Sequence, residues 1–174
     1  MFKSIVVAFD GSVHSSKALE IGATLAARDQ VALGIIYVID AGHMQIPGEM
    51  RKMGEIEHII EPMPRMVIDF EEAPVNLVNT MAQNSVNSEK AMLQYADFLV
   101  EQARKSAGEY GAQDVDARAV LGSPAEEVVA FAKDREADLI ICGSRGFGRL
   151  KSLLLGSTSH KITQLAECSC LTTK

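Results

Sequence analysis

The sequence predicts one α/β domain with a doubly wound parallel sheet and helices on both faces. Three observations lead to this prediction. Short β-branched runs alternate with amphipathic stretches along the chain, which is typical of βαβ units with right-handed crossovers. The run at 31–39 is apolar at nearly every position, as expected of a strand that helices cover on both sides. The length of 174 residues suits one domain better than two.

The amino-terminal part predicts the first βαβ unit. Residues 4–9 form a short apolar run that ends at Asp10, in an Asp-Gly turn signal. Residues 13–28 place apolar side chains on one helical stripe, and Ser12 is a suitable N-cap. Residues 31–39 then form the second strand.

The carboxyl-terminal part continues the alternation. Ser123 is followed by Pro124 and, three residues after the serine, by Glu126. This pattern combines a capping box with proline at the first helical position, so a helix should begin at Pro124. The other elements are expected at residues 89–107 (helix), 114–121 (strand), 138–142 (strand), 157–167 (helix) and 170–172 (strand).

The segment 42–88 is too long for an ordinary connection, so we expect a single domain over residues 1–174 with an extended insertion. Six of the eight methionines lie in this segment. Residues 49–60 could form an amphipathic helix with a methionine-rich face, a kind of surface that adapts to varied partners. A regulatory protein partner or self-association is one interpretation; packing on the same domain and partial disorder are the alternatives.

Composition argues against several classes of function. The net charge of −6 and the absence of a basic stripe argue against nucleic acid as a partner. No run approaches the ~18 apolar residues of a membrane span. The apolar run at the start is too short for a signal peptide, so we expect a cytoplasmic protein. Three cysteines and four histidines show no metal-ligand spacing, so we expect reduced thiols and no metal-binding histidine.

The stretch 143–159 has the features of a phosphate-binding segment. Its glycines allow close backbone approach, and Arg145, Arg149 and Lys151 make it cationic. A helix is expected to begin at Ser157, and the free N–H groups of a helix N-terminus bind anions. Hydroxyls at residues 157–159 can add donors. A large side chain at the first or last glycine should block phosphate while leaving the sheet folded.

Two familiar phosphate loops do not fit this stretch. A P-loop needs Lys-Ser/Thr after its last glycine, and Arg149-Leu150 follows Gly148 instead. The dinucleotide fingerprint begins at Gly146 and Gly148, but Lys151 stands where its third glycine should be. G-x-S-x-G is also absent, and Ser144 has no predicted base beside it. No catalytic residue is assigned.

Gly143, Gly146, Gly156 and Ser157 fill the pattern G-x2-G-x9-G-[ST]. In this pattern the sequence resembles the ATP-binding members of the universal stress protein family. The resemblance extends over nearly the whole chain except residues 42–88. It also includes residues 4–12, 37–40, 122–124 and 137–140.

The resemblance implies a five-stranded sheet in the order 3-2-1-4-5, of the adenine nucleotide α-hydrolase-like type. It implies that Asp10 and Val38 hold adenine, that the first motif glycine lies at the ribose, and that the later motif residues hold phosphates. With the cationic and hydroxyl side chains of the loop added, the expected nucleotide-binding residues are Asp10, Val38, Gly143, Arg145, Gly146, Gly156, Ser157 and Thr158. The expected ligand is ATP, with AMP and ADP as alternatives. Mg²⁺ could bind together with the nucleotide.

The function implied by the resemblance is stress-response regulation, with the nucleotide as a switch of conformation or assembly. A slow ATP hydrolase and a nucleotide-free scaffold remain alternatives. Family members usually form dimers through the last strand. Here the matching segment 169–173 is more polar than the family pattern. We expect a homodimer or higher homo-oligomer, and the sequence does not assign the surface that forms its interface.

Overall fold

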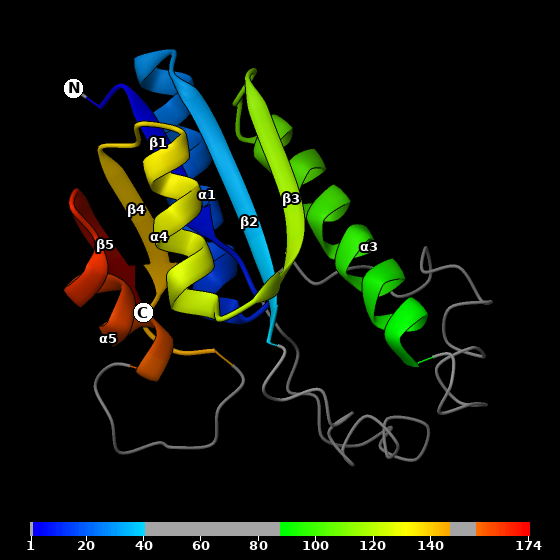
Figure 1. The fold of residues 1–174 in the computed structure, drawn as a ribbon. Helices are drawn as coiled ribbons and strands as arrows, with labels where there is room; N and C mark the ends of the chain where they lie inside the picture. The colour runs from blue at the N-terminus through cyan, green and yellow to red at the C-terminus, as the bar shows by residue number, and fades with distance from the viewer. Residues whose placement is uncertain (1, 41–87, 147–155) are drawn as a thin grey trace.

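The computed structural model describes residues 2–40, 88–146 and 156–174. Five parallel strands form one sheet in the order β3-β2-β1-β4-β5, as predicted (Figure 1). The strands all point their carboxyl ends to the same edge of the sheet, the lower edge in Figure 1. Their bounds are Ser4–Ala8 (β1), Ala32–Asp40 (β2), Val115–Gly122 (β3), Leu139–Gly143 (β4) and Ser169–Thr173 (β5).

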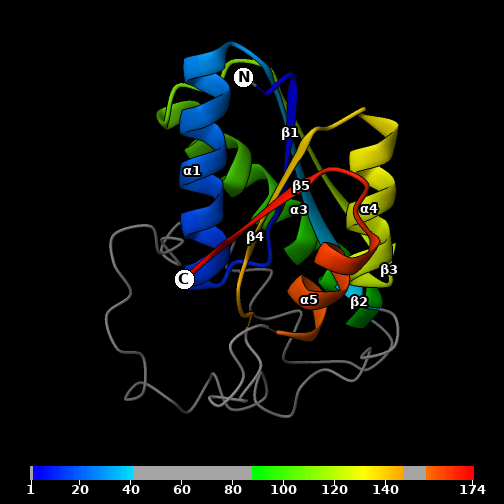
Figure 2. The same cartoon turned by 90° about the vertical axis from the view of Figure 1, so that its left-hand side faces the viewer.

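In the described part of the chain, four helices cover the two faces of this sheet, as the apolar strands predicted. They are α1 (Val13–Asp29), α3 (Ser88–Glu109), α4 (Pro124–Asp134) and α5 (Ser157–Leu165). Helices α1 and α3 pack in one apolar cluster, and α4 and α5 pack in the other. Figure 2 shows α1 on one side of the sheet and α4 with α5 on the other.

The central strand β1 connects the two halves of the core. Ile5 and Val7 point toward α1 and α3, whereas Val6 points toward α4 and α5. All three side chains are fully buried. Burying an aliphatic side chain of this size contributes about 1.5–3 kcal/mol, so the short β1 run stabilises both layers. Because β1 is packed on both faces, the core holds the ends of the central strands in fixed positions.

The two helix starts predicted from capping signals have different outcomes. Ser12 is the N-cap of α1, and its hydroxyl accepts a hydrogen bond from Ser15 N at 3.2 Å, as predicted. Ser123 is the N-cap of α4, which begins at Pro124 as predicted, but its side chain makes no cap hydrogen bond. The cap hydrogen bond predicted from the Ser123 hydroxyl was therefore wrong. The Glu126 carboxylate accepts a hydrogen bond from Lys161 Nζ at 2.8 Å and also interacts with the Ser123 side chain.

The prediction about the methionine-rich helix at 49–60 lies outside the described residues, and so does nearly all of the insertion at 42–88. Within residues 2–40, 88–146 and 156–174, no helix combines the length and apolarity that crossing a membrane requires.

We predict that replacing glycine by alanine has opposite effects on stability at two helical positions, Gly22 and Gly108. A Cβ at Gly22 of α1 would lie 2.5 Å from Val7 Cγ2, whereas a Cβ at Gly108 of α3 would meet no heavy atom within 4 Å. Alanine gains about 0.5–1 kcal/mol of helix propensity at either site, but overpacking at Gly22 costs about 1–3 kcal/mol. In urea denaturation, Gly108→Ala should raise the midpoint and Gly22→Ala should lower it. Shifts in the same direction would contradict the packing described for α1.

Candidate functional site

The candidate site lies at the carboxyl edge of the sheet, where the strand order reverses. Strand β1 lies between β2 and β4. The chain leaves β1 toward the α1 face, and it leaves β4 toward the α5 face. Such a switch point opens a crevice between the two exits, where α/β proteins bind ligands. Two segments lie at this point, the β1 turn (residues 10–12) and the β4 turn (residues 144–146).

The β1 turn and the β4 turn touch each other. Ser12 N donates to Asp10 Oδ1 at 2.9 Å, and Ser12 Oγ donates to the Arg145 carbonyl at 3.4 Å. The other carboxylate oxygen of Asp10 lies against Gly146, where any Cβ would collide with it. Asp10 therefore lies beside Arg145 and Gly146, although more than 130 positions separate it from them in the sequence.

Ser144 joins the β4 turn to the start of α5. Its carbonyl accepts hydrogen bonds from Gly156 N at 2.7 Å and from Ser159 Oγ at 3.2 Å. Its N–H donates to the Thr173 carbonyl at 2.7 Å. Ser144 is 2% exposed, so it holds the site together from beneath rather than facing a ligand. The sequence pattern does not reveal this role, and its one signal is a serine directly after an apolar strand.

The amino end of α5 presents free backbone donors at this site. Gly156 is the N-cap, with φ −71° and ψ 160°. The first N–H groups of a helix have no intrahelical acceptor, and the helix dipole places partial positive charge there. Ser157 and Thr158 are exposed, so their hydroxyls are available to a ligand. This arrangement favours an anion such as a phosphate.

Ser159 differs from the two hydroxyl residues before it. Its side chain is 4% exposed, and its hydroxyl donates to the carbonyls of Ser144 and Gly156 at 3.2 and 3.0 Å. The expectation that all three hydroxyls of residues 157–159 could serve a ligand is therefore wrong for Ser159. Its hydroxyl fixes the first turn of α5 onto the β4 turn instead.

Gly143 has a packing role that the glycine motif did not reveal. A Cβ at this position would lie 2.9 Å from both His14 Cβ and Ser15 N. The end of β4 thus passes directly against the first turn of α1. A large side chain at Gly143 would press α1 away from β4, a cost in stability that the prediction of an intact sheet did not include.

Val38 lies on β2, one strand beyond the two turns. The register pairs Ala8 with Ile36, and Phe9 N donates to the Ile36 carbonyl at 2.9 Å. Continued by two residues, this register puts Asp10 at the level of Val38. Val38 is partly buried on the α4 and α5 face, so it can form an apolar wall on the same side as the amino end of α5.

Two titratable side chains near this edge, Tyr37 and Cys142, are held in their neutral forms. Burial raises the pKa of Tyr37 to about 12, with smaller contributions from Tyr95 and Asp10. Burial also raises the pKa of the Cys142 thiol to about 12, with smaller contributions from Cys170 and Asp10. At neutral pH these groups are poor bases and poor nucleophiles, since catalysis by either requires deprotonation.

The described residues contain no group of three or more His, Cys, Asp or Glu side chains placed to hold a metal ion. Two of the three cationic side chains of the stretch 143–159, Arg149 and Lys151, lie outside the described residues. Arg145 is described and half-buried, and its carbonyl already bonds to Ser12.

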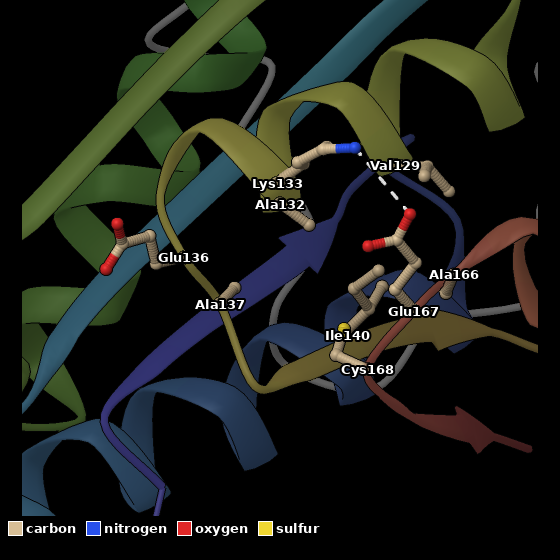
Figure 3. Close-up of a pocket in the computed structure, with 9 residues that line it drawn as sticks. All are labelled: Val129, Ala132, Lys133, Glu136, Ala137, Ile140, Ala166, Glu167 and Cys168. Carbon is tan, nitrogen blue, oxygen red and sulfur yellow. Dashed lines mark ion pairs between the residues drawn. The ribbon is translucent and has the colours of Figure 1, made fainter.

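A cleft of about 290 Å³ lies at the opposite edge of the sheet (Figure 3). Ala137 and Cys168, which precede β4 and β5, line it together with Ile140. An ion pair of 3.6 Å between Lys133 and Glu167 spans it, as the dashed line in Figure 3 shows. Because this cleft lies at the amino ends of the strands, it is separate from the candidate site.

The fold and the site together define a doubly wound α/β domain whose switch point presents backbone N–H donors. The profile of the Universal stress protein family matches residues 1–174. The chain therefore belongs to the universal stress protein family, as its glycine motif indicated.

Individual relatives agree with this assignment over their whole length. Universal stress protein YxiE of Bacillus subtilis (strain 168) is 32% identical over 174 residues, covering 98% of each chain. The solved structure of protein MJ0577 has a TM-score of 0.68 at 22% identity, covering 100% of this chain and 96% of that one. A universal stress protein in complex with cAMP has a TM-score of 0.61 at 19% identity, covering 99% and 96%. These structures share the fold described here.

We predict that alanine at the first and the last glycine of the motif, Gly143 and Gly156, lowers stability by different amounts. Gly143→Ala should lower the free energy of unfolding by about 1–3 kcal/mol, because its Cβ would press on the backbone of α1. Gly156→Ala should cost less than about 1 kcal/mol, since its Cβ would meet Ser144 O at an ordinary 3.4 Å. Urea denaturation measures both. Equal losses at the two positions would contradict the contact between β4 and α1.

Proposed function

We propose that this protein binds ATP or a related adenine nucleotide at the carboxyl edge of its sheet. One observation supports the proposal above all. The amino end of α5 and the β1 turn, which are far apart in sequence, are both hydrogen-bonded to the β4 turn, through the carbonyls of Ser144 and Arg145. Backbone donors and a carboxylate therefore face one crevice, as a ligand with a base and a phosphate requires.

The roles of the residues follow from this placement. The N–H groups and hydroxyls at Ser157 and Thr158 would bind the phosphates, beside the backbone of Gly156. Gly146 would let the phosphate chain pass close to the β4 turn, and Arg145 would add positive charge.

The base would lie on the other side of the crevice. The carboxylate of Asp10 would accept a hydrogen bond from the adenine amino group, and Val38 would contact the face of the ring. Gly143 would lie near the ribose. Its lack of a side chain also allows β4 to pack closely on α1. A dry apolar wall with one or two polar anchors is typical of a small-ligand site.

A structurally similar universal stress protein has been solved in complex with cAMP. The cAMP was observed in that protein and not in this one. Because the two proteins share a fold, adenine nucleotides are the first class of ligand to test here. Binding without turnover is the preferred form of the proposal. Tyr37 and Cys142 are neutral and so are poor bases, and the Asp10 carboxylate already accepts a hydrogen bond from Ser12 N and is assigned to the adenine.

We further propose that the nucleotide acts as a regulatory switch in a cytoplasmic homo-oligomer. A hydrogen bond joins the β1 turn to the β4 turn, and two others join the β4 turn to the start of α5. A ligand that bridges these segments would favour one arrangement over others. Mg²⁺ would accompany the phosphates of ATP. The insertion at 42–88 is proposed as a surface for self-association or for a regulatory protein partner.

Titration calorimetry with ATP, AMP and cAMP tests the binding proposal. The wild-type chain should bind ATP at millimolar concentration or below. The double variant Ser157→Ala with Thr158→Ala should bind roughly tenfold more weakly or worse, because two donors to charged phosphate are lost. A matched control is Thr163→Ala, since Thr163 lies on the same helix and its hydroxyl bonds to the His160 carbonyl at 2.7 Å.

The control should bind ATP like the wild type, because Thr163 lies in the second turn of α5, away from its amino end. Unchanged affinity in the double variant would reject the phosphate assignment at α5. Absence of measurable ATP binding in the wild type would reject the proposed function as a whole.

The switch is tested by light scattering and by amide hydrogen exchange, each with and without saturating ATP. We expect ATP to change the molar mass or to slow exchange at the β4 turn and the first turn of α5, because the ligand bridges these segments. If ATP binds and both measurements stay unchanged, the protein is a nucleotide binder without the switch.

A further inference from the structure

Thr173, the last residue of the edge strand β5, has an unusually enclosed position for a polar side chain. It is 5% exposed. Its hydroxyl donates to the His14 carbonyl in the first turn of α1 at 2.6 Å, and it lies 3.5 Å from the Cys142 carbonyl. Thr173 therefore joins β5 to the same turn of α1 against which Gly143 packs.

The backbone of Thr173 makes a second connection, to the candidate site. Its carbonyl accepts the hydrogen bond from Ser144 N at 2.7 Å. The carbonyl of Ser144 in turn accepts from Gly156 N and Ser159 Oγ. A continuous path of hydrogen bonds thus leads from α1 through Thr173 and Ser144 to the amino end of α5.

The hydroxyl of Thr173 is the part of this path that packing alone does not require. A valine has the same shape and would fill the space at the end of a strand at least as well. Burying a hydroxyl costs free energy unless it is hydrogen-bonded. Its bond to the α1 carbonyl satisfies this requirement and fixes the position of the carbonyl that holds Ser144.

We propose that Thr173 is a positioning residue for the nucleotide site. By tying the end of β5 to α1, it holds the Ser144 carbonyl where it orients Gly156 and the first turn of α5. The phosphate donors are then in place before the ligand arrives, and preorganised donors bind more tightly than mobile ones. This inference rests on the proposed function for its ligand, but the geometry it invokes exists without a ligand.

The test compares Thr173→Val, which removes the hydroxyl, with Thr173→Ser, which keeps it. ATP affinity should fall roughly five- to tenfold in Thr173→Val, the value of about one hydrogen bond, and should return in Thr173→Ser. Thr172→Val is the matched control, because Thr172 is the neighbouring threonine on the other face of β5. Val100→Ala, a core change in α3, shows what a loss of stability does by itself.

Amide hydrogen exchange without nucleotide supplies the second measurement. The amides of Ser144 and Gly156 should exchange faster in Thr173→Val and at the wild-type rate in Thr173→Ser, while the amides of β1 stay protected. This readout does not depend on ATP. It therefore separates failure of the positioning role from failure of the proposed function.

Three results would count against the positioning role or the proposed function. If the wild type binds ATP and Thr173→Val binds equally well, or if Thr173→Ser is as weak as Thr173→Val, the positioning role is wrong. If Val100→Ala weakens binding as much as Thr173→Val at equal loss of stability, the effect is general destabilisation and the inference is also wrong. If the wild type binds no nucleotide, the proposed function fails, and exchange at Gly156 alone decides whether Thr173 positions this turn.

Discussion

The close approach of β4 to the first turn of α1 is the constraint on which the site depends. It exists because Gly143 has no side chain, and a Cβ there would lie 2.9 Å from Ser15 N. This contact brings the exit of β4 beside the exit of β1. The hydroxyl of Ser12 can then reach the Arg145 carbonyl. A wider spacing would separate the β1 turn from the β4 turn.

The small polar residues around this contact divide into two groups. Ser12, Ser144, Ser159 and Thr173 are buried, and each makes hydrogen bonds within the protein. They determine the shape of the site, because an unsatisfied buried polar group is costly and each bond has one good geometry. The exposed hydroxyls, which belong to Ser157 and Thr158, face outward and are the ones that a ligand can use.

The two edges of the sheet have opposite electrostatic character. Helices α1, α4 and α5 begin at the carboxyl edge and end at the amino edge. Their dipoles therefore place positive potential at the candidate site and negative potential near the cleft of Figure 3. A chain of net charge −6 can bind a small anion for this reason, because the field is local and comes from backbone groups rather than from side-chain charge.

The sequence by itself determined the order of elements, the doubly wound sheet, the N-cap at Ser12 and the identity of the glycine motif. These features depend on periodicity and on neighbours a few positions apart. Only the tertiary structure decided that Ser159 turns inward, that Glu126 bonds to Lys161 rather than capping α4, and that Thr173 anchors Ser144. Their partners lie on other elements, and a contact between distant segments is set by how helices and strands pack, which local pattern does not encode.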